Sequence, residues 1–81
     1  MTEADIYARL TPVFHDVFDD DELVVTPKLT ADDVPEWDSM SHVRLMLTVE
    51  RAFGTRFAAA EIAGLKNVGE LVALIQRHAD R

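Results

Sequence analysis

Three side chains that could take part in group transfer lie close together near the middle of the chain. Asp38 and Ser39 are adjacent, and His42 follows three residues later in the run PEWDSMSHVRLML, residues 35–47. A serine hydroxyl becomes a nucleophile when a histidine lies within hydrogen-bonding reach and an acid orients that histidine. Adjacent residues such as Asp38 and Ser39 point apart, however, and the serine has no glycine-rich strained turn around it. We therefore expect no catalytic residue, and a protein that is not an enzyme.

Ser39 also stands where a helix is expected to begin, and this position offers it two other roles. Its hydroxyl could cap the helix by accepting a hydrogen bond from a free backbone N–H, a contact worth about 0.5–2 kcal/mol. Asp38 could equally be the cap, which would leave the Ser39 side chain facing solvent. Because free N–H groups and the helix dipole favour an anion at a helix start, a phosphoryl group esterified to Ser39 would be well placed.

The composition excludes several kinds of site. The 81 residues include no cysteine, which excludes disulfides, zinc–thiolate sites and a cysteine nucleophile. The acidic run from Asp19 has Val24 and Thr30 where an EF-hand needs glycine and glutamate, and we predict no metal site.

With 15 acids, 8 bases and a net charge of −7, the chain is not expected to bind nucleic acid. No apolar stretch is long enough for a membrane span and no signal-peptide pattern is present, so we expect a cytoplasmic protein.

The acids are concentrated just ahead of Ser39. Residues 19–38 hold eight acids and one base, whereas residues 39–81 hold four acids and six bases. A solvated loop would account for this segment. A docking surface would account for it too, because a net electric field steers oppositely charged partners together.

Hydrophobic periodicity predicts the helices that would position Ser39. Apolar residues recur with helical spacing over the first 18 residues, where Thr2 could be the cap. Pro12 would either kink this helix or open a second helical piece, and we expect one kinked helix. The next helix is expected from Ser39 to Phe53, because Gly54 is a good stop signal.

The remaining segments predict a long loop and two more helices. Residues 59–65 suit a short helix, and Asn67 with Glu70 comes close to a capping box for the last one. A loop as long as residues 19–38 needs apolar anchors. The expected anchors are Leu23, Val25, Leu29, Val34 and Trp37. We predict one domain, residues 1–81, with an all-α fold: a small four-helix bundle with three main helices, one short helix and a long loop after the first helix.

The predicted core is the apolar face of each long helix. The first contributes Ile6, Leu10, Val13, Phe14 and Val17, and the last contributes Val68, Leu71, Val72, Leu74 and Ile75. The central helix contributes a stripe of Val43, Met46, Leu47 and Phe53, widened by Leu45 and Val49. His15 and His78 are expected at the surface.

The run DSMSHVRLMLTVERAFG, residues 38–54, resembles the signature of the acyl carrier protein family: Asp-Ser-Leu or Asp-Ser-Met, an apolar helix, and Phe-Gly. The resemblance extends over essentially the whole chain, in the order of its predicted helices. It implies a protein that holds an acyl group as a thioester on a 4′-phosphopantetheine arm at Ser39 and delivers it to partner enzymes. The thiol of that arm is consistent with a chain that has no cysteine of its own.

The resemblance also implies roles for residues near Ser39. Asp38 would help the phosphopantetheinyl transferase to dock, and Met40 would lie beside the arm. His42 could contact the attached phosphate or be a surface residue without a role. Further partners would be a ligase or transferase that loads the acyl or aminoacyl group, and a downstream synthase or acyltransferase, each meeting a monomer. The expected docking residues are Glu36, Asp38, Met40, Arg44 and Glu50.

The central helix departs from the fatty-acid carriers of this family. Ser41, Arg44 and Arg51 stand at places where acids are common. This difference favours other partner enzymes, in secondary-metabolite or polysaccharide biosynthesis. Asp-Ser-Met also occurs in D-alanyl carriers, so an aminoacyl cargo is one alternative. A helical interaction module that is never modified, with Ser39 as a simple cap, is the other.

Overall fold

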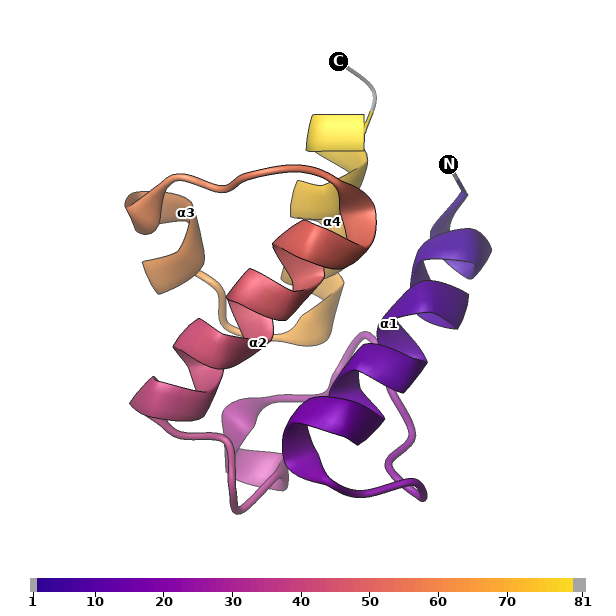
Figure 1. Cartoon of the computed structure of the whole chain (residues 1–81), viewed down its shortest axis with the longest axis vertical. Coiled ribbons are helices and arrows are strands. Elements are labelled where there is room, and N and C mark those ends of the chain that lie inside the picture. Colours follow the sequence, from indigo (N-terminus) through magenta and orange to yellow (C-terminus); the bar gives the residue numbers. More distant parts are fainter. Residues whose placement is uncertain (1, 80–81) are drawn as a thin grey trace.

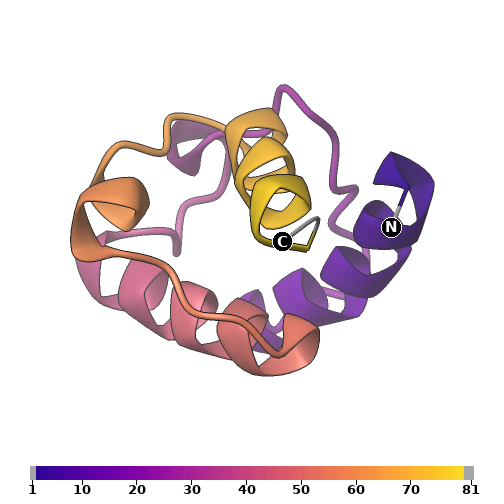
Figure 2. The ribbon, with the colours of Figure 1, turned by 90° about the horizontal axis from the view of Figure 1, so that it is seen from above.

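The computed structural model describes residues 2–79, which form four α-helices joined by loops, without a strand in that range (Figure 1). The helices are α1 (Glu3–Phe18), α2 (Ser39–Phe53), α3 (Ala59–Ala63) and α4 (Val68–Ala79), and a 3-10 helix (Ala31–Asp33) lies between α1 and α2. Figure 2 shows α4 in the middle, with the other helices and the long loop arranged around it. The predicted fold class, with three main helices, one short helix and a long first loop, is confirmed.

α1 begins at a capping box and continues through its proline. The Thr2 hydroxyl accepts a hydrogen bond from the Asp5 N–H at 3.2 Å, and the Asp5 carboxylate accepts one from the Thr2 N–H at 3.4 Å. Pro12 has no N–H for the carbonyl of Ala8, but Ala8 is exposed, so water can bond to that oxygen. α1 is one helix through Pro12, as predicted, and no second helical piece starts there, whereas the kink expected at Pro12 stays a prediction.

The core lies where α1, α2 and α4 face one another. Every core residue predicted in α1 and α4 is buried, and so are Leu45, Met46 and Val49 of α2. The prediction is wrong for Val43 and Leu47, whose side chains are 56% and 53% exposed. Both lie on the side of α2 that faces away from this core, and α3, with only five residues, is too short to cover that side. Phe53 is half-buried against the core.

The long loop is fixed to the core by its apolar residues. Leu29 and Val34 are buried, and Leu23, Val25 and Trp37 pack against the core, which confirms the five predicted anchors. His15 also holds this loop, because its Nε2 donates a hydrogen bond to the Leu23 carbonyl at 2.8 Å. The prediction that His15 is a simple surface residue is therefore wrong.

The loop in turn holds the start of α4. The carbonyls of Leu29 and Pro27 accept hydrogen bonds from the N–H groups of Val68 and Gly69, each at 3.0 Å. A Cβ atom at position 69 would lie 3.1 Å from the Pro27 oxygen, which explains the glycine. These contacts satisfy helix-start N–H groups that would otherwise lack partners.

The predicted cap of α4 is confirmed, whereas α3 ends earlier than predicted. Asn67 Oδ1 accepts a hydrogen bond from the Glu70 N–H at 2.8 Å, as predicted for the cap of α4. α3 ends at Ala63, two residues before the predicted end of the short helix. Across residues 2–79, no helix combines the length and the apolar character needed to cross a membrane.

Candidate functional site

Asp38, rather than Ser39, caps α2. Asp38 Oδ1 accepts a hydrogen bond from the Ser41 N–H at 2.9 Å, and Ser41 Oγ accepts one from the Asp38 N–H at 2.8 Å. The Ser41 hydroxyl also donates to the Glu36 carbonyl at 2.7 Å. Of the two capping alternatives that the sequence leaves open, the structure has the one in which Asp38 is the cap.

This arrangement leaves the Ser39 hydroxyl free. Ser39 is the first residue of α2 and is exposed, and its side chain makes no hydrogen bond to another residue of the described range 2–79. Capping therefore does not compete with chemistry at this oxygen. The hydroxyl stands at the helix start, where an attached phosphate would meet the positive end of the helix dipole.

The Asp38 carboxyl should titrate below its ordinary pKa of 3.8, first because the Ser41 N–H and then because the Ser41 hydroxyl bonds to its charged form. Because folding lowers the pKa of Asp38, its cap stabilises the folded state at pH values above the pKa of the unfolded chain. This stabilisation is lost as the pH falls through the lower pKa of the folded state. An NMR pH titration that follows the Asp38 carboxyl carbon should have its midpoint below the ordinary aspartate pKa, and Ser41→Ala should raise that midpoint. A midpoint at or above the ordinary value would contradict the cap.

His42 joins the long loop, α2 and α3. The Trp37 Nε1–H donates to His42 Nδ1 at 3.1 Å, and an indole nitrogen can only donate, so Nδ1 carries no proton. The proton therefore lies on Nε2, which donates to the Ile62 carbonyl of α3 at 3.1 Å. The two rings lie nearly parallel, at 22°, with their centroids 6.1 Å apart, so the hydrogen bond joins them edge to edge. The interpretation of His42 as a surface residue without a role is wrong, whereas its contact with a phosphate stays a prediction.

Replacing His42 with alanine should lower the free energy of unfolding by about 1–3 kcal/mol, because the Trp37 N–H and the Ile62 carbonyl would both lose their partner. Urea unfolding, followed by tryptophan fluorescence, measures this change. Val43→Ala, at the exposed position next in the chain, is the matched control and should change stability by less than about 0.5 kcal/mol. Equal effects in the two variants would show that the His42 hydrogen bonds contribute nothing.

An open, mostly apolar groove of about 540 Å³ begins beside Ser39 and runs between α2 and α3. A flexible chain attached to the Ser39 oxygen could lie along this groove, since carbon-rich side chains form most of its walls. The lining residues are Ala31, Trp37, Ser39, His42, Val43, Ala59, Ile62, Ala63 and Leu65.

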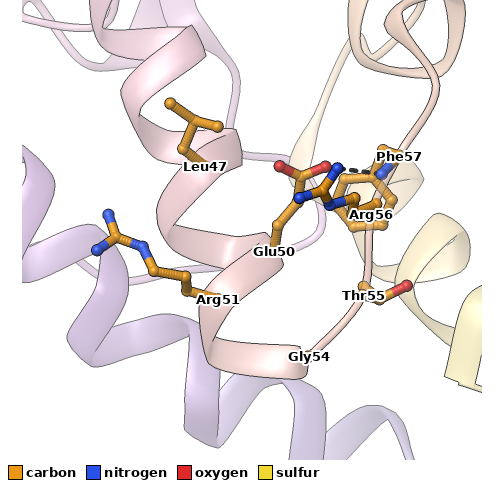
Figure 3. Close-up of a pocket in the computed structure, with 7 residues that line it drawn as sticks. All are labelled: Leu47, Glu50, Arg51, Gly54, Thr55, Arg56 and Phe57. Atoms are coloured by element: carbon orange, nitrogen blue, oxygen red, sulfur yellow. Dashed lines mark hydrogen bonds between the residues drawn. The ribbon is translucent and has the colours of Figure 1, made fainter.

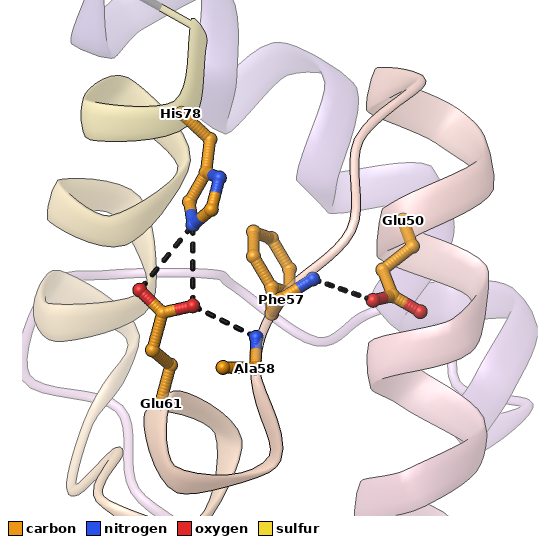
Figure 4. Close-up of polar contacts among 5 residues, drawn as sticks. All are labelled: Glu50, Phe57, Ala58, Glu61 and His78. Atoms are coloured by element: carbon orange, nitrogen blue, oxygen red, sulfur yellow. Dashed lines mark hydrogen bonds and ion pairs between the residues drawn. The ribbon is translucent and has the colours of Figure 1, made fainter.

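The far wall of the groove, α3, is held in place from two sides (Figure 4). On one side, Glu50 of α2 accepts a hydrogen bond from the Phe57 N–H at 2.7 Å. On the other, Nε2 of His78 lies 3.3 Å from the Glu61 carboxylate, which also accepts from the Ala58 N–H at 2.8 Å. The prediction that His78 is a surface residue is therefore wrong: it is half-buried and ties α4 to α3.

The five predicted docking residues differ in how free they are. Glu36, Asp38 and Met40 are exposed at the start of α2, and Met40 has 83% of its surface exposed. Arg44 instead donates to the Val17 carbonyl at 2.8 Å, near the end of α1, and Glu50 is held by the Phe57 N–H. Docking by each of them stays a prediction. The exposed apolar face of α2 was not predicted, although the spacing of Met40, Val43 and Leu47 could have indicated it.

Comparisons with known proteins agree on one family. The family model described as "Phosphopantetheine attachment site" matches residues 36–75. The chain is 32% identical over 76 residues to the meromycolate extension acyl carrier protein of Mycolicibacterium smegmatis, covering 94% of this chain and 77% of that protein. It is 28% identical over 76 residues to acyl carrier protein 2 of Ralstonia nicotianae, covering 94% of each chain.

A solved structure gives the same result for the fold. The solution NMR structure of the holo acyl carrier protein from Geobacter metallireducens superposes with a TM-score of 0.86 at 41% sequence identity, covering 93% of this chain and 86% of that one. The sequence and the structure are thus both similar to acyl carrier proteins over nearly all of the chain.

Proposed function

We propose, since this chain belongs to the acyl carrier protein family, that the Ser39 hydroxyl is the attachment point of its 4′-phosphopantetheine group. The chain is a carrier that brings an acyl group to enzymes, and is not itself an enzyme. The observation that carries the proposal for Ser39 is its exposed hydroxyl at the start of α2, left free because Asp38 makes the cap. Asp38 would aid the transferase by presenting an ionised carboxylate beside the hydroxyl.

The residues around Ser39 fit such a group. A separate phosphopantetheinyl transferase would join the Ser39 oxygen to the pantetheine-bearing phosphorus of coenzyme A. The pyrophosphate P–O bond would break, and the serine proton and adenosine 3′,5′-bisphosphate would be released. When bound, the group supplies a thiol on which an acyl chain is held as a thioester. The part of this chain is to keep the hydroxyl exposed and to offer the groove between α2 and α3 to what is attached.

The start of α2 would meet basic surfaces of partner enzymes. Glu36 and Asp38 are exposed next to Ser39, in the segment that holds most of the acids, and Met40 adds an exposed apolar contact. Opposite charges of this kind speed encounter and orient the partners. Arg44 and Glu50 would take part through the faces of their side chains that their structural contacts leave free.

An acyl cargo is supported more strongly than an aminoacyl one. The groove beside Ser39 is mostly apolar, and several relatives are named as meromycolate extension acyl carrier proteins. We expect a specialised pathway, in secondary-metabolite, polysaccharide or lipid biosynthesis. The reason is that α2 has few acids, whereas the central helix of the fatty-acid carriers of this family has many. We still predict that the chain is a monomer and that it forms a single domain.

Intact-mass measurement tests the proposal. The protein is incubated with coenzyme A, magnesium and a broad-specificity phosphopantetheinyl transferase, and fragmentation of the product then locates the added group. We expect one phosphopantetheine per chain, on Ser39. A protein that gains no mass, or gains it elsewhere, would overturn the assignment. Loading the product with an acyl or a D-alanyl group by the corresponding ligases then separates the two cargo classes.

A further inference from the structure

One face of α2 is exposed along its whole length and changes character from one end to the other. Met40, Val43 and Leu47 are spaced by three and four residues, so their side chains lie on one side of the helix, 83%, 56% and 53% exposed. Arg51 follows four residues after Leu47 on the same side, and it is also exposed. The face is therefore apolar beside Ser39 and becomes basic near the end of the helix.

An open hollow of about 800 Å³ lies at this basic end. Figure 3 shows Leu47 and Arg51 projecting from α2, and Arg56 coming from the segment that follows the helix. Gly54 ends the helix with a φ of 64°, and the chain that follows brings Arg56 to the hollow on the side of Glu50, whereas Arg51 lines it from the other side of α2 (Figure 3). The lining residues are Leu47, Glu50, Arg51, Gly54, Thr55, Arg56 and Phe57.

The two arginines have no acidic partner in the part of the chain that the structure describes, residues 2–79. The one carboxylate in the hollow, that of Glu50, accepts a hydrogen bond from the Phe57 N–H at 2.7 Å and keeps its negative charge, so two arginines and one glutamate leave the lining with a net charge of +1. Arg51 in the last turn would stabilise the negative end of the helix dipole whatever else it does. Arg56 lies beyond the helix end, where this explanation does not apply, so the hollow presents positive charge that the fold does not use.

The segment that leads into the opposite end of α2 is acidic. Asp38 and Glu36 are exposed beside Ser39, and the loop of residues 19–38 carries eight acids and one base. Arg51 is twelve residues beyond Ser39, which corresponds to about 18 Å along a helix. Negative charge therefore lies just ahead of the exposed face, near the proposed attachment point, and positive charge lies at the far end of that face.

We propose that the second half of α2 and the segment after it bind an acidic, amphipathic surface of a partner enzyme. Carboxylates of that surface would face Arg51 and Arg56, and an apolar side chain would cover Leu47. This docking rests on the proposed function, since the partner must also reach the group on Ser39. Such a partner presents basic groups around its active-site entrance and carboxylates about 18 Å away. Opposite charges at the two ends fix the docking direction and disfavour partners with uniformly basic surfaces.

Binding of two designed peptides tests this proposal. One is an amphipathic helical peptide with leucines on one face and glutamates beside them, and the other has lysines in place of the glutamates. On the ¹⁵N-labelled protein, the glutamate peptide should shift the amide signals of residues 47–57. Arg51→Glu with Arg56→Glu should weaken its binding about tenfold, since two favourable exposed charge pairs become repulsive. Lys28→Glu with Arg77→Glu makes the same change of net charge elsewhere and should retain the binding.

Several results would overturn the proposal. Signals that move only outside residues 47–57 would place the binding elsewhere. Equal weakening by the two double variants would show that only net charge matters. Vesicles of phosphatidylglycerol that bind at these residues when the glutamate peptide does not would assign the surface to lipid. Circular dichroism verifies folding, and Arg51→Gln with Arg56→Gln replaces the charge reversal if that variant unfolds. Ser39→Ala should bind the peptide normally, so a failure of this docking and a failure of attachment at Ser39 are distinguished.

Discussion

Replacing Ser39 with alanine is expected to abolish the mass gain from coenzyme A while leaving the free energy of unfolding within about 0.5 kcal/mol of the unchanged protein. The modification should be lost completely because the chain has one other serine, Ser41, and its hydroxyl is held by Asp38 and Glu36. Stability should be kept because the Ser39 side chain caps nothing. Intact mass and urea unfolding measure the two effects.

Ser41→Ala is the matched control and should behave in the opposite way. It removes a hydroxyl two residues along the chain, and with it the bonds to the Asp38 N–H and the Glu36 carbonyl, while the Ser41 N–H can still bond to Asp38, so stability should fall. Ser39 keeps its oxygen, so the mass gain should remain. If Ser39→Ala instead lost the 0.5–2 kcal/mol of a helix cap, or still gained mass, the assignment of the two serines would be wrong.

Features that depend on neighbours in the sequence were predictable. Thr2, Gly54 and Asn67 act at helix ends through atoms within a few residues, so residue type and spacing are sufficient to find them. The choice between Asp38 and Ser39 as the cap of α2 was not predictable in this way. Both residue types cap helices, and the outcome depends on the backbone at Asp38 and on Ser41.

Features that depend on distant residues could not be read from spacing. His42 acquires its structural role from Ile62, twenty residues away, and His78 acquires its role from Glu61, seventeen residues away. Helical periodicity finds a wide apolar stripe on α2, but it does not say which part of the stripe another helix covers. That part was settled by the five-residue length of α3, which leaves Val43 and Leu47 exposed.

Two leucines of α2 provide a direct measurement of this division between the core and the exposed face. Leu45 has no exposed surface, whereas Leu47, two residues later, is 53% exposed. Leu45→Ala should lower the free energy of unfolding by about 2–5 kcal/mol, because it removes buried methyl groups and leaves a cavity. A chain of 81 residues is expected to have only about 4–12 kcal/mol of total stability, so this loss is a large share. Urea unfolding of both variants gives the comparison.

Leu47→Ala should change stability by less than about 0.5 kcal/mol, because its side chain remains in contact with solvent when the protein folds. The same variant should weaken binding of the glutamate peptide, since Leu47 is the apolar part of the proposed docking hollow. An exposed apolar residue at an interaction site is expected to contribute to binding but little to folding, as predicted here for Leu47. If Leu47→Ala destabilised the protein as strongly as Leu45→Ala, α2 would be buried on both sides, and neither the groove beside Ser39 nor the docking face could be open.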